Sequence, residues 1–68
     1  MNIERIISTS KADKSGFQVV LAKVEGFHPF VVWLRDAGHN YCNGWYNSNL
    51  ANAMQDYIER CNFNHVEA

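Results

Sequence analysis

Four short segments of the chain are rich in apolar residues in patterns typical of β-strands, and the second of them is apolar on both faces. Isoleucine, valine, phenylalanine, tryptophan and tyrosine, which favour extended backbone, are concentrated in these segments. Polar or glycine-containing stretches that favour turns separate them. We therefore predict strands at Ile3–Ser8, Phe17–Glu25, Phe30–Asp36 and Tyr41–Tyr46. Glycine in the last segment predicts a bulge or a close backbone approach at Gly44.

After the fourth segment the hydrophobic spacing becomes helical, with apolar residues on one stripe and polar residues opposite. The helix is expected to begin near Asn47, Ser48 or Asn49, because each can accept a hydrogen bond from a free amide of the first turn. Asn62 or Asn64 is expected to end it, followed by a frayed tail. The stripe that should cover a sheet consists of Leu50, Ala53, Met54, Tyr57, Ile58 and Cys61.

The predicted order is four strands followed by one helix. Short connections favour hydrogen bonding between consecutive strands, so the natural sheet is an antiparallel meander. We expect an α+β fold in which the C-terminal helix packs on one face of a four-stranded sheet. The length indicates one small domain that spans residues 1–68.

The face of the sheet away from the helix is also predicted to be apolar, and two explanations stay open. It is either a contact surface for another molecule, or strand twist and the loop at Thr9–Gly16 cover it. The residues of this face are drawn from Val20, Ala22, Val24, Val31 and Trp33.

Composition favours a binding partner. Hydrophobic residues make up 47% of the 68 positions, and two Trp, three Tyr and four Phe are among them. A chain of this size buries only about 60% of the surface that its unfolded form exposes. One sheet face and one helix stripe do not easily hide so many large side chains, so self-association or a bound partner is expected.

The charge pattern excludes several classes of protein. Six basic residues are scattered and the net charge is −1, whereas proteins that bind phosphate backbones usually carry a basic excess. The first residues lack the layout of a signal peptide, and no apolar run is long enough to span a bilayer. We expect a soluble cytoplasmic protein, with no membrane contact, in which Cys42 and Cys61 are free thiols.

Neither a metal site nor a catalytic site is expected. His39 and Cys42 have a metal-ligand spacing, and His28, Cys61 and His65 are further candidates, but structural zinc sites normally use two close-spaced pairs. A nucleophilic Cys42 would need a pocket, and a small sheet offers little concavity. We therefore predict no metal, no cofactor and no enzymatic activity.

Binding of single-stranded nucleic acid is the alternative function, because aromatic side chains on a sheet can stack on bases. The charge argues against it. The aromatic residues available for such stacking are Phe30, Trp33, Tyr41, Trp45 and Tyr46.

Residues Phe30–Arg60 resemble a group of small proteins from phages, prophages and other mobile elements. The similarity lies in a Val-Trp strand, a glycine-containing hairpin, an aromatic Gly-x-Tyr strand and the helix pattern Leu-x-x-Ala-x-x-x-Tyr-x-x-Arg. The resemblance implies a compact sheet-plus-helix domain. Several phage proteins of this size inhibit bacterial defence systems, among them the anti-CRISPR proteins. The residues that carry the similarity are Val32, Trp33, Gly44, Tyr46, Leu50, Ala53, Tyr57 and Arg60.

The sequence thus predicts a non-catalytic inhibitor that occludes a host protein or protein complex. A homodimer is a further expectation, and nucleic acid is not the expected partner. Aromatic and arginine side chains anchor many protein interfaces. The residues expected to contact the partner are Trp33, Arg35, Asp36, His39, Trp45 and Tyr46.

Overall fold

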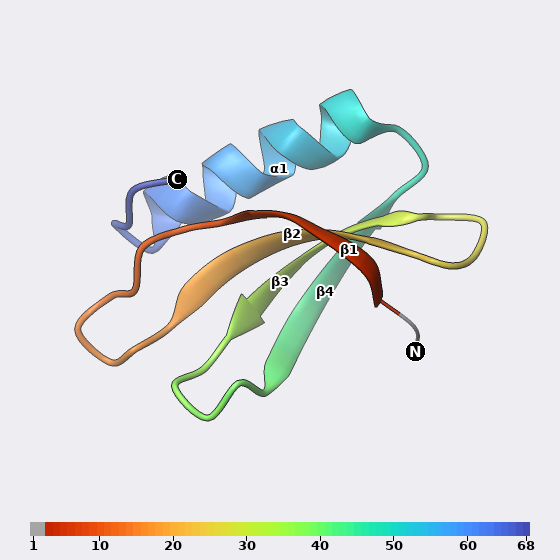
Figure 1. Cartoon of the computed structure of the whole chain (residues 1–68). Coiled ribbons are helices and arrows are strands. Elements are labelled where there is room, and N and C mark those ends of the chain that lie inside the picture. Colours follow the sequence, from red (N-terminus) through yellow and green to blue (C-terminus); the bar gives the residue numbers. More distant parts are fainter. Residues whose placement is uncertain (1–2) are drawn as a thin grey trace.

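The computed structural model describes residues 3–68 and confirms the predicted α+β fold (Figure 1). All neighbouring strands are antiparallel and lie in the order β1-β2-β3-β4. A single sheet and one C-terminal helix packed on it therefore form the described chain. The elements are β1 at Ile3–Thr9, β2 at Gln18–Val24, β3 at Phe30–Arg35, β4 at Tyr41–Asn47 and α1 at Leu50–Phe63.

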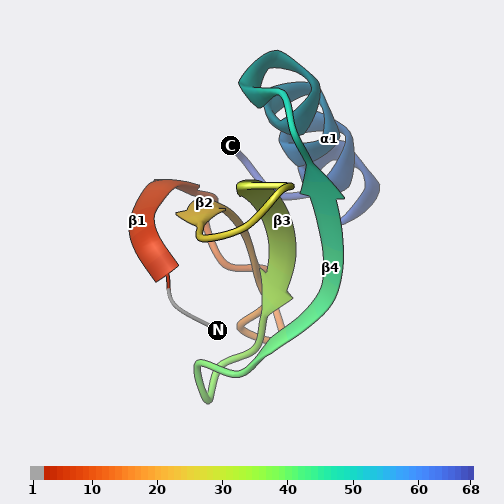
Figure 2. The ribbon, with the colours of Figure 1, turned by 90° about the vertical axis from the view of Figure 1, so that its right-hand side faces the viewer.

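The two outer strands bend, whereas the inner pair is regular. β2 and β3 pair without interruption, but the register shifts twice between β1 and β2 and once between β3 and β4. Such bulges increase the local twist of a strand, and β1 and β4 curve at the two sides of the sheet (Figure 2). The bulge in β4 includes Asn43, which has a positive φ of 55°. The prediction of a bulge in this strand is confirmed.

Helix α1 begins where an asparagine caps it. The side chain of Asn49 accepts hydrogen bonds from the backbone N–H groups of Ala51 and Asn52 at 2.8 and 3.2 Å. At the other end, the N–H of Asn64 donates to the carbonyl of Arg60 at 3.0 Å. Both caps are among the candidates predicted from the sequence, but the left-handed conformation expected of the C-terminal asparagine is adopted by His65 instead.

The main core lies between α1 and the sheet. The helix packs against β2, β3 and β4. The buried stripe of the helix fills the space above the sheet, which supplies valine and leucine from its two central strands. Burial of these apolar side chains is the main source of stability. The core consists of Val19, Leu21, Val32, Ala53, Tyr57 and Cys61.

The six-residue apolar face predicted for α1 is only half buried, so the prediction that all of it covers the sheet is wrong. Ala53, Tyr57 and Cys61 are buried, but the other three apolar residues of the stripe are 38–51% exposed. In residues 3–68 the backbone of α1 lies close to β2, β3 and β4 but not to β1, which the helix reaches through the side chain of Tyr57, so one side of the helix stays partly uncovered. These exposed residues, called the helix stripe below, are Leu50, Met54 and Ile58.

The tail after α1 is held in place, so the prediction that it frays is wrong. His65 has a positive φ of 56°, which turns the chain back from the end of the helix. Val66 then packs against the main core, and the N–H of Lys11 donates to the carbonyl of Glu67 at 2.9 Å. The tail therefore connects the end of the helix to the loop that follows β1.

A second cluster of apolar side chains lies on the opposite face of the sheet. Its members are at most 6% exposed, so other parts of the chain cover them. The explanation that the chain covers this face itself therefore holds for its centre. The members of the cluster are Val20, Ala22, Val24, Val31 and Trp33.

Ser10 is a buried polar residue at the end of the pairing between β1 and β2, which sequence reasoning left in a polar loop. Its Oγ accepts a hydrogen bond from the N–H of Val19 at 2.8 Å and donates to the carbonyl of Lys11 at 2.9 Å. The serine therefore satisfies a backbone N–H that has no access to water.

Replacing Ser10 with alanine is expected to lower the free energy of unfolding by about 1–3 kcal/mol, because the N–H of Val19 would lose its acceptor. Urea denaturation followed by circular dichroism measures this change. Ser15→Ala is the matched control: this serine is exposed, and its loss should change stability by no more than about 0.5 kcal/mol. Equal effects of the two substitutions would contradict the role given to Ser10.

Candidate protein-binding surface

The face of the sheet opposite α1 combines a buried centre with exposed large side chains at both sides. Two isoleucines from β1 and two tyrosines from β4 are 37–44% exposed there. The register places the isoleucines on this face, because Ile3 lies opposite Val24 and Ile6 lies opposite Ala22. We call this surface the aromatic face, and it consists of Ile3, Ile6, Trp33, Arg35, Tyr41 and Tyr46.

Trp33 packs against both tyrosines of the aromatic face. Its ring centre is 4.7 Å from that of Tyr41 at a tilted angle and 6.5 Å from that of Tyr46 in an edge-to-face arrangement. A Cβ atom on Gly44 would lie 2.8 Å from the ring of Tyr46 and 3.0 Å from the indole nitrogen of Trp33. The predicted close approach at this glycine is confirmed, and it lets the three rings pack together.

Arg35 lies beside these rings at the end of β3. Its Nη2 donates to the side-chain oxygen of Gln18 at 2.9 Å, and its guanidinium carbon is 5.9 Å from the ring centre of Tyr41. Its Nε–H is shielded from solvent and has no hydrogen-bond acceptor among residues 3–68. The aromatic face thus contains one positive charge whose hydrogen bonds are incomplete.

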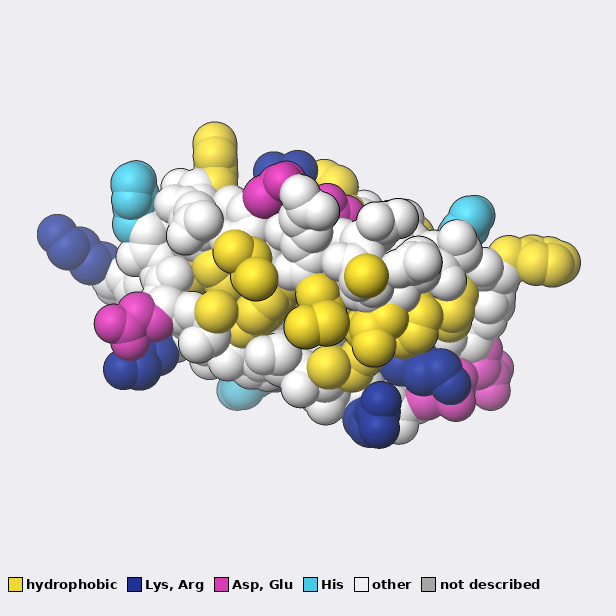
Figure 3. Space-filling view, turned by 90° about the horizontal axis from the view of Figure 1, so that it is seen from above, with side chains coloured by type: hydrophobic (Ala, Val, Ile, Leu, Met, Phe, Trp, Pro, Cys, Tyr) yellow, Lys and Arg dark blue, Asp and Glu magenta, His cyan; other side chains and the backbone are white. Residues whose placement is uncertain are grey.

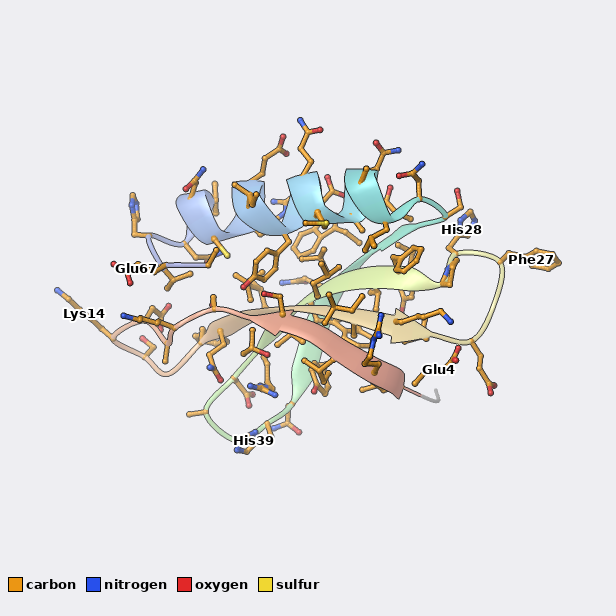
Figure 4. All side chains as sticks on the ribbon, turned by 45° about the horizontal axis from the view of Figure 1, so that its top comes forward. Glu4, Lys14, Phe27, His28, His39 and Glu67 are labelled. Carbon is orange, nitrogen blue, oxygen red and sulfur yellow. The ribbon has the colours of Figure 1, made fainter. Side chains whose placement is uncertain are left out.

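The turn between β3 and β4 uses Asp36 for its own structure. The Oδ1 of this residue accepts hydrogen bonds from the N–H groups of Gly38 and Asn40, both at 2.9 Å. The N–H of Asn40, together with weaker contributions from its side chain, from Gly38 and from His39, lowers the pKa of Asp36, against a smaller opposing effect of desolvation. His39 has a positive φ of 64° and points away from the sheet at the tip of the turn (Figure 4).

Trp45 lies on the other side of the sheet from the aromatic face. It packs against the main core, and the guanidinium carbon of Arg60 is 3.9 Å from the centre of its ring. Neighbouring residues of a strand point to opposite faces, so Trp45 and Tyr46 cannot both belong to one sheet surface. Of the six residues expected to contact a partner, the structure brings together Trp33, Arg35 and Tyr46 on the aromatic face, with Asp36 and His39 in the adjoining turn.

The thiols and histidines do not form a reactive cluster. Cys42 is exposed, and its thiol lies 3.5 Å from the carbonyl of Leu34, to which it donates. Cys61 is buried, and desolvation raises its pKa, as it does for Tyr57. The structure shows both cysteines as free thiols. In residues 3–68, no three side chains of His, Cys, Asp or Glu lie close enough together to hold a metal ion.

An open hollow of about 460 Å³ lies between the loop after β1 and the turn after α1. Asp13 lines it but already accepts hydrogen bonds from the N–H groups of Ser15 and Phe17 at 2.8 and 2.9 Å. Lys14, which also lines it, extends away from the body of the molecule (Figure 4). The side chains of this hollow therefore do not converge on a common point.

Two exposed apolar features were missed by sequence reasoning. Phe27 is 96% exposed and projects from the tip of the β2–β3 loop (Figure 4). The helix stripe lies within a band of apolar side chains that is visible when the molecule is viewed from above α1 (Figure 3). The spacing of the stripe did identify its residues, but it could not show that the sheet ends before covering them.

No protein-family model, curated protein or solved structure matches the chain. Within residues 3–68, no helix has the length and apolar character needed to cross a membrane.

Proposed function

We propose that the protein is a non-catalytic binding protein that occludes a partner protein with its aromatic face. The observation that carries this proposal is the group of four large apolar side chains that stay 37–44% exposed around a buried tryptophan. Exposed apolar groups of this kind mark protein contact sites, and tyrosine and arginine are common anchors of interfaces. A four-stranded sheet with a packed core holds these side chains in fixed positions.

The charges favour a protein partner over single-stranded nucleic acid. Stacking platforms for nucleic acid normally lie in a groove with several basic side chains, but Arg35 is the one basic residue of the aromatic face. On the neighbouring strand β2, the basic residue Lys23 lies on the helix side of the sheet, 3.5 Å from Glu4. Nucleic-acid binding accordingly remains the second candidate, supported by the tyrosine rings alone.

The specific form of the proposal is an anti-defence inhibitor of phage or mobile-element origin, such as an anti-CRISPR protein, that acts on a host protein complex in the bacterial cytoplasm. Its support is the resemblance of Phe30–Arg60 to small proteins of that kind. A homodimer is also proposed, because apolar side chains are exposed on both sides of the sheet. Expression of the protein in a bacterium with active CRISPR immunity, followed by phage challenge, tests the specific form.

Glutamate at Ile6 or at Tyr46 is expected to prevent capture of the partner, because each substitution places a charge in the centre of the contact. The measurement is affinity capture from a bacterial lysate with mass spectrometry, in which a specific partner is retained by the wild type and lost with both variants. The matched control is Met54→Glu, which adds the same charge to the helix stripe on the opposite side of the sheet. Circular dichroism verifies that all variants are folded.

The reverse pattern would contradict the assignment of the surface. If Met54→Glu prevented capture and both substitutions on the aromatic face had no effect, the partner would bind the helix stripe. If all three variants retained the partner, neither surface would be the contact.

A further inference from the structure

Arg35 has a positive charge that the rest of the described chain does not neutralise. Among residues 3–68, no carboxylate lies within 4.0 Å of its guanidinium group, as is also true of Arg5, Lys14 and Arg60, whereas Lys11 and Lys23 each have an acidic neighbour at 2.9 and 3.5 Å. Of the unpaired cations, Arg35 is the one on the aromatic face. Within the described part of the chain, the side-chain acceptor that it finds is the neutral amide oxygen of Gln18. A charged group at the edge of an apolar surface is therefore left without an ionic partner.

The hydrogen bonds of Arg35 are also incomplete. A guanidinium group carries five N–H donors in a planar fork, and the Nε–H of Arg35 is shielded from water without an acceptor in the described residues. Buried donors are nearly always paired in folded proteins. The missing counter-charge indicates that an acceptor of negative charge comes from another molecule, and such an acceptor would meet the fork at its terminal N–H groups, because the Nε–H is shielded.

We propose that the aromatic face recognises a carboxylate of the partner protein, an aspartate or glutamate side chain flanked by apolar residues. The carboxylate pairs with Arg35, since this fork matches two carboxylate oxygens better than any other charged group of proteins. The flanking apolar residues lie on Tyr41, Tyr46 and Ile6. This inference rests on the proposed function and adds the chemistry of the segment that is bound.

A phosphate of a nucleic acid has similar chemistry, but the distribution of charge favours a protein. Binding to a phosphate backbone uses several basic groups along a track, and the other five basic residues lie away from this face. Two of them, Arg5 and Lys23, lie opposite each other in the register on the helix side of the sheet. The other three are Lys11 and Lys14 in the loop after β1 and Arg60 on α1.

The test is a selection of random twelve-residue peptides on phage, carried out against the wild-type protein and against Arg35→Gln. We expect wild-type binders to share one acidic position between apolar residues, and binders of the variant to lack it. One wild-type binder is then synthesised with its acid and with the matching amide. The amide should weaken binding to the wild type by about tenfold or more, since charge-assisted hydrogen bonds are the strong ones.

The same pair of peptides should bind Arg35→Gln with nearly equal affinity, because the carboxylate then has no guanidinium to pair with. This coupling between two substitutions separates a direct contact from a structural role of the arginine. Arg35→Lys serves as a second variant: it keeps the charge but lacks the fork, and it is expected to give an intermediate difference between the two peptides. Thermal unfolding establishes that both variants are folded.

Other results would overturn the inference in ways that can be told apart. Selected peptides that depend on Tyr46 but contain no common acid would reject the role of Arg35 and leave the proposed function standing. Failure to select any peptide would reject both. Salt-sensitive binding of a thymidine oligonucleotide that is lost in Arg35→Gln would show that the site binds a phosphate, and the nucleic-acid function would then hold.

Discussion

Replacing Trp33 with alanine is expected to leave the protein largely unfolded at room temperature. The side chain is 6% exposed and packs with both exposed tyrosines of β4. Removal of a buried aromatic side chain costs about 3–5 kcal/mol, through lost burial and the cavity left behind. A single core in a chain of this length supplies about 3–5 kcal/mol in total. The loss is therefore as large as the stability available.

Circular dichroism and the dispersion of amide NMR signals measure this effect, and Tyr46→Ala is the control. Tyr46 lies on the same face but is 44% exposed, so its loss should leave the protein folded. A variant lacking Trp33 that unfolds at nearly the denaturant concentration of the wild type would show that the indole is not part of the core. It would then be reasonable to treat it as a direct contact for a partner.

This distinction decides how an alanine scan of the predicted contact residues must be interpreted. Loss of binding at Trp33 is uninformative, because unfolding has the same result. Loss of binding at Trp45 is ambiguous as well, since that ring packs on the opposite side of the sheet with Arg60. Of the predicted contact residues on the aromatic face, Arg35 and Tyr46 are the two where a change in binding without unfolding identifies a contact.

The fold was predictable because local signals agreed with one another. The alternation along β2 and β3 determines which residues share a face, and their pairing in the structure is unbroken from Gln18–Arg35 to Lys23–Phe30. Three polar residues in succession before a helical pattern signal a capped start, and Asn49 fulfils that role. Such signals depend on neighbouring residues only, so sequence alone contains them.

The position of the helix across the sheet was not predictable in the same way. The apolar stripe of α1 includes Met54 and Ile58, and nothing in its spacing shows that the helix backbone lies away from β1. The burial of Trp33 likewise depends on bulges that curve the outer strands and on Gly44, which lets the rings approach. These features follow from contacts between distant parts of the chain.

The residues predicted to contact a partner lie on both faces of the sheet for a related reason. Adjacent positions in one strand must point to opposite faces, and this rule alone separates Trp45 from Tyr46. The contribution of β1, by contrast, needed the register of the sheet, because only pairing with β2 places Ile3 and Ile6 on the aromatic face. The incomplete hydrogen bonds of Arg35 are visible only in three dimensions.

Replacing Tyr57 with alanine is expected to be as damaging as the loss of Trp33, but through the opposite face of the sheet. Tyr57 is buried at the centre of the contact between α1 and the sheet, and its hydroxyl accepts a hydrogen bond from Ser8 of β1 at 3.2 Å. Loss of the ring should cost about 3–5 kcal/mol. Tyr57→Phe keeps the ring and loses only that hydrogen bond, so about 1 kcal/mol is expected.

Because the central strands β2 and β3 contribute to both clusters, the two faces should unfold as one unit, as small domains usually do. Trp33 on one face and Trp45 on the other provide separate probes through their indole N–H signals in NMR spectra. In Tyr57→Phe, both signals should disappear at the same urea concentration, which is lower than that of the wild type. If the signal of Trp45 disappeared first while that of Trp33 persisted, the helix would detach from a sheet that stays folded, and the aromatic face would be stable without the main core.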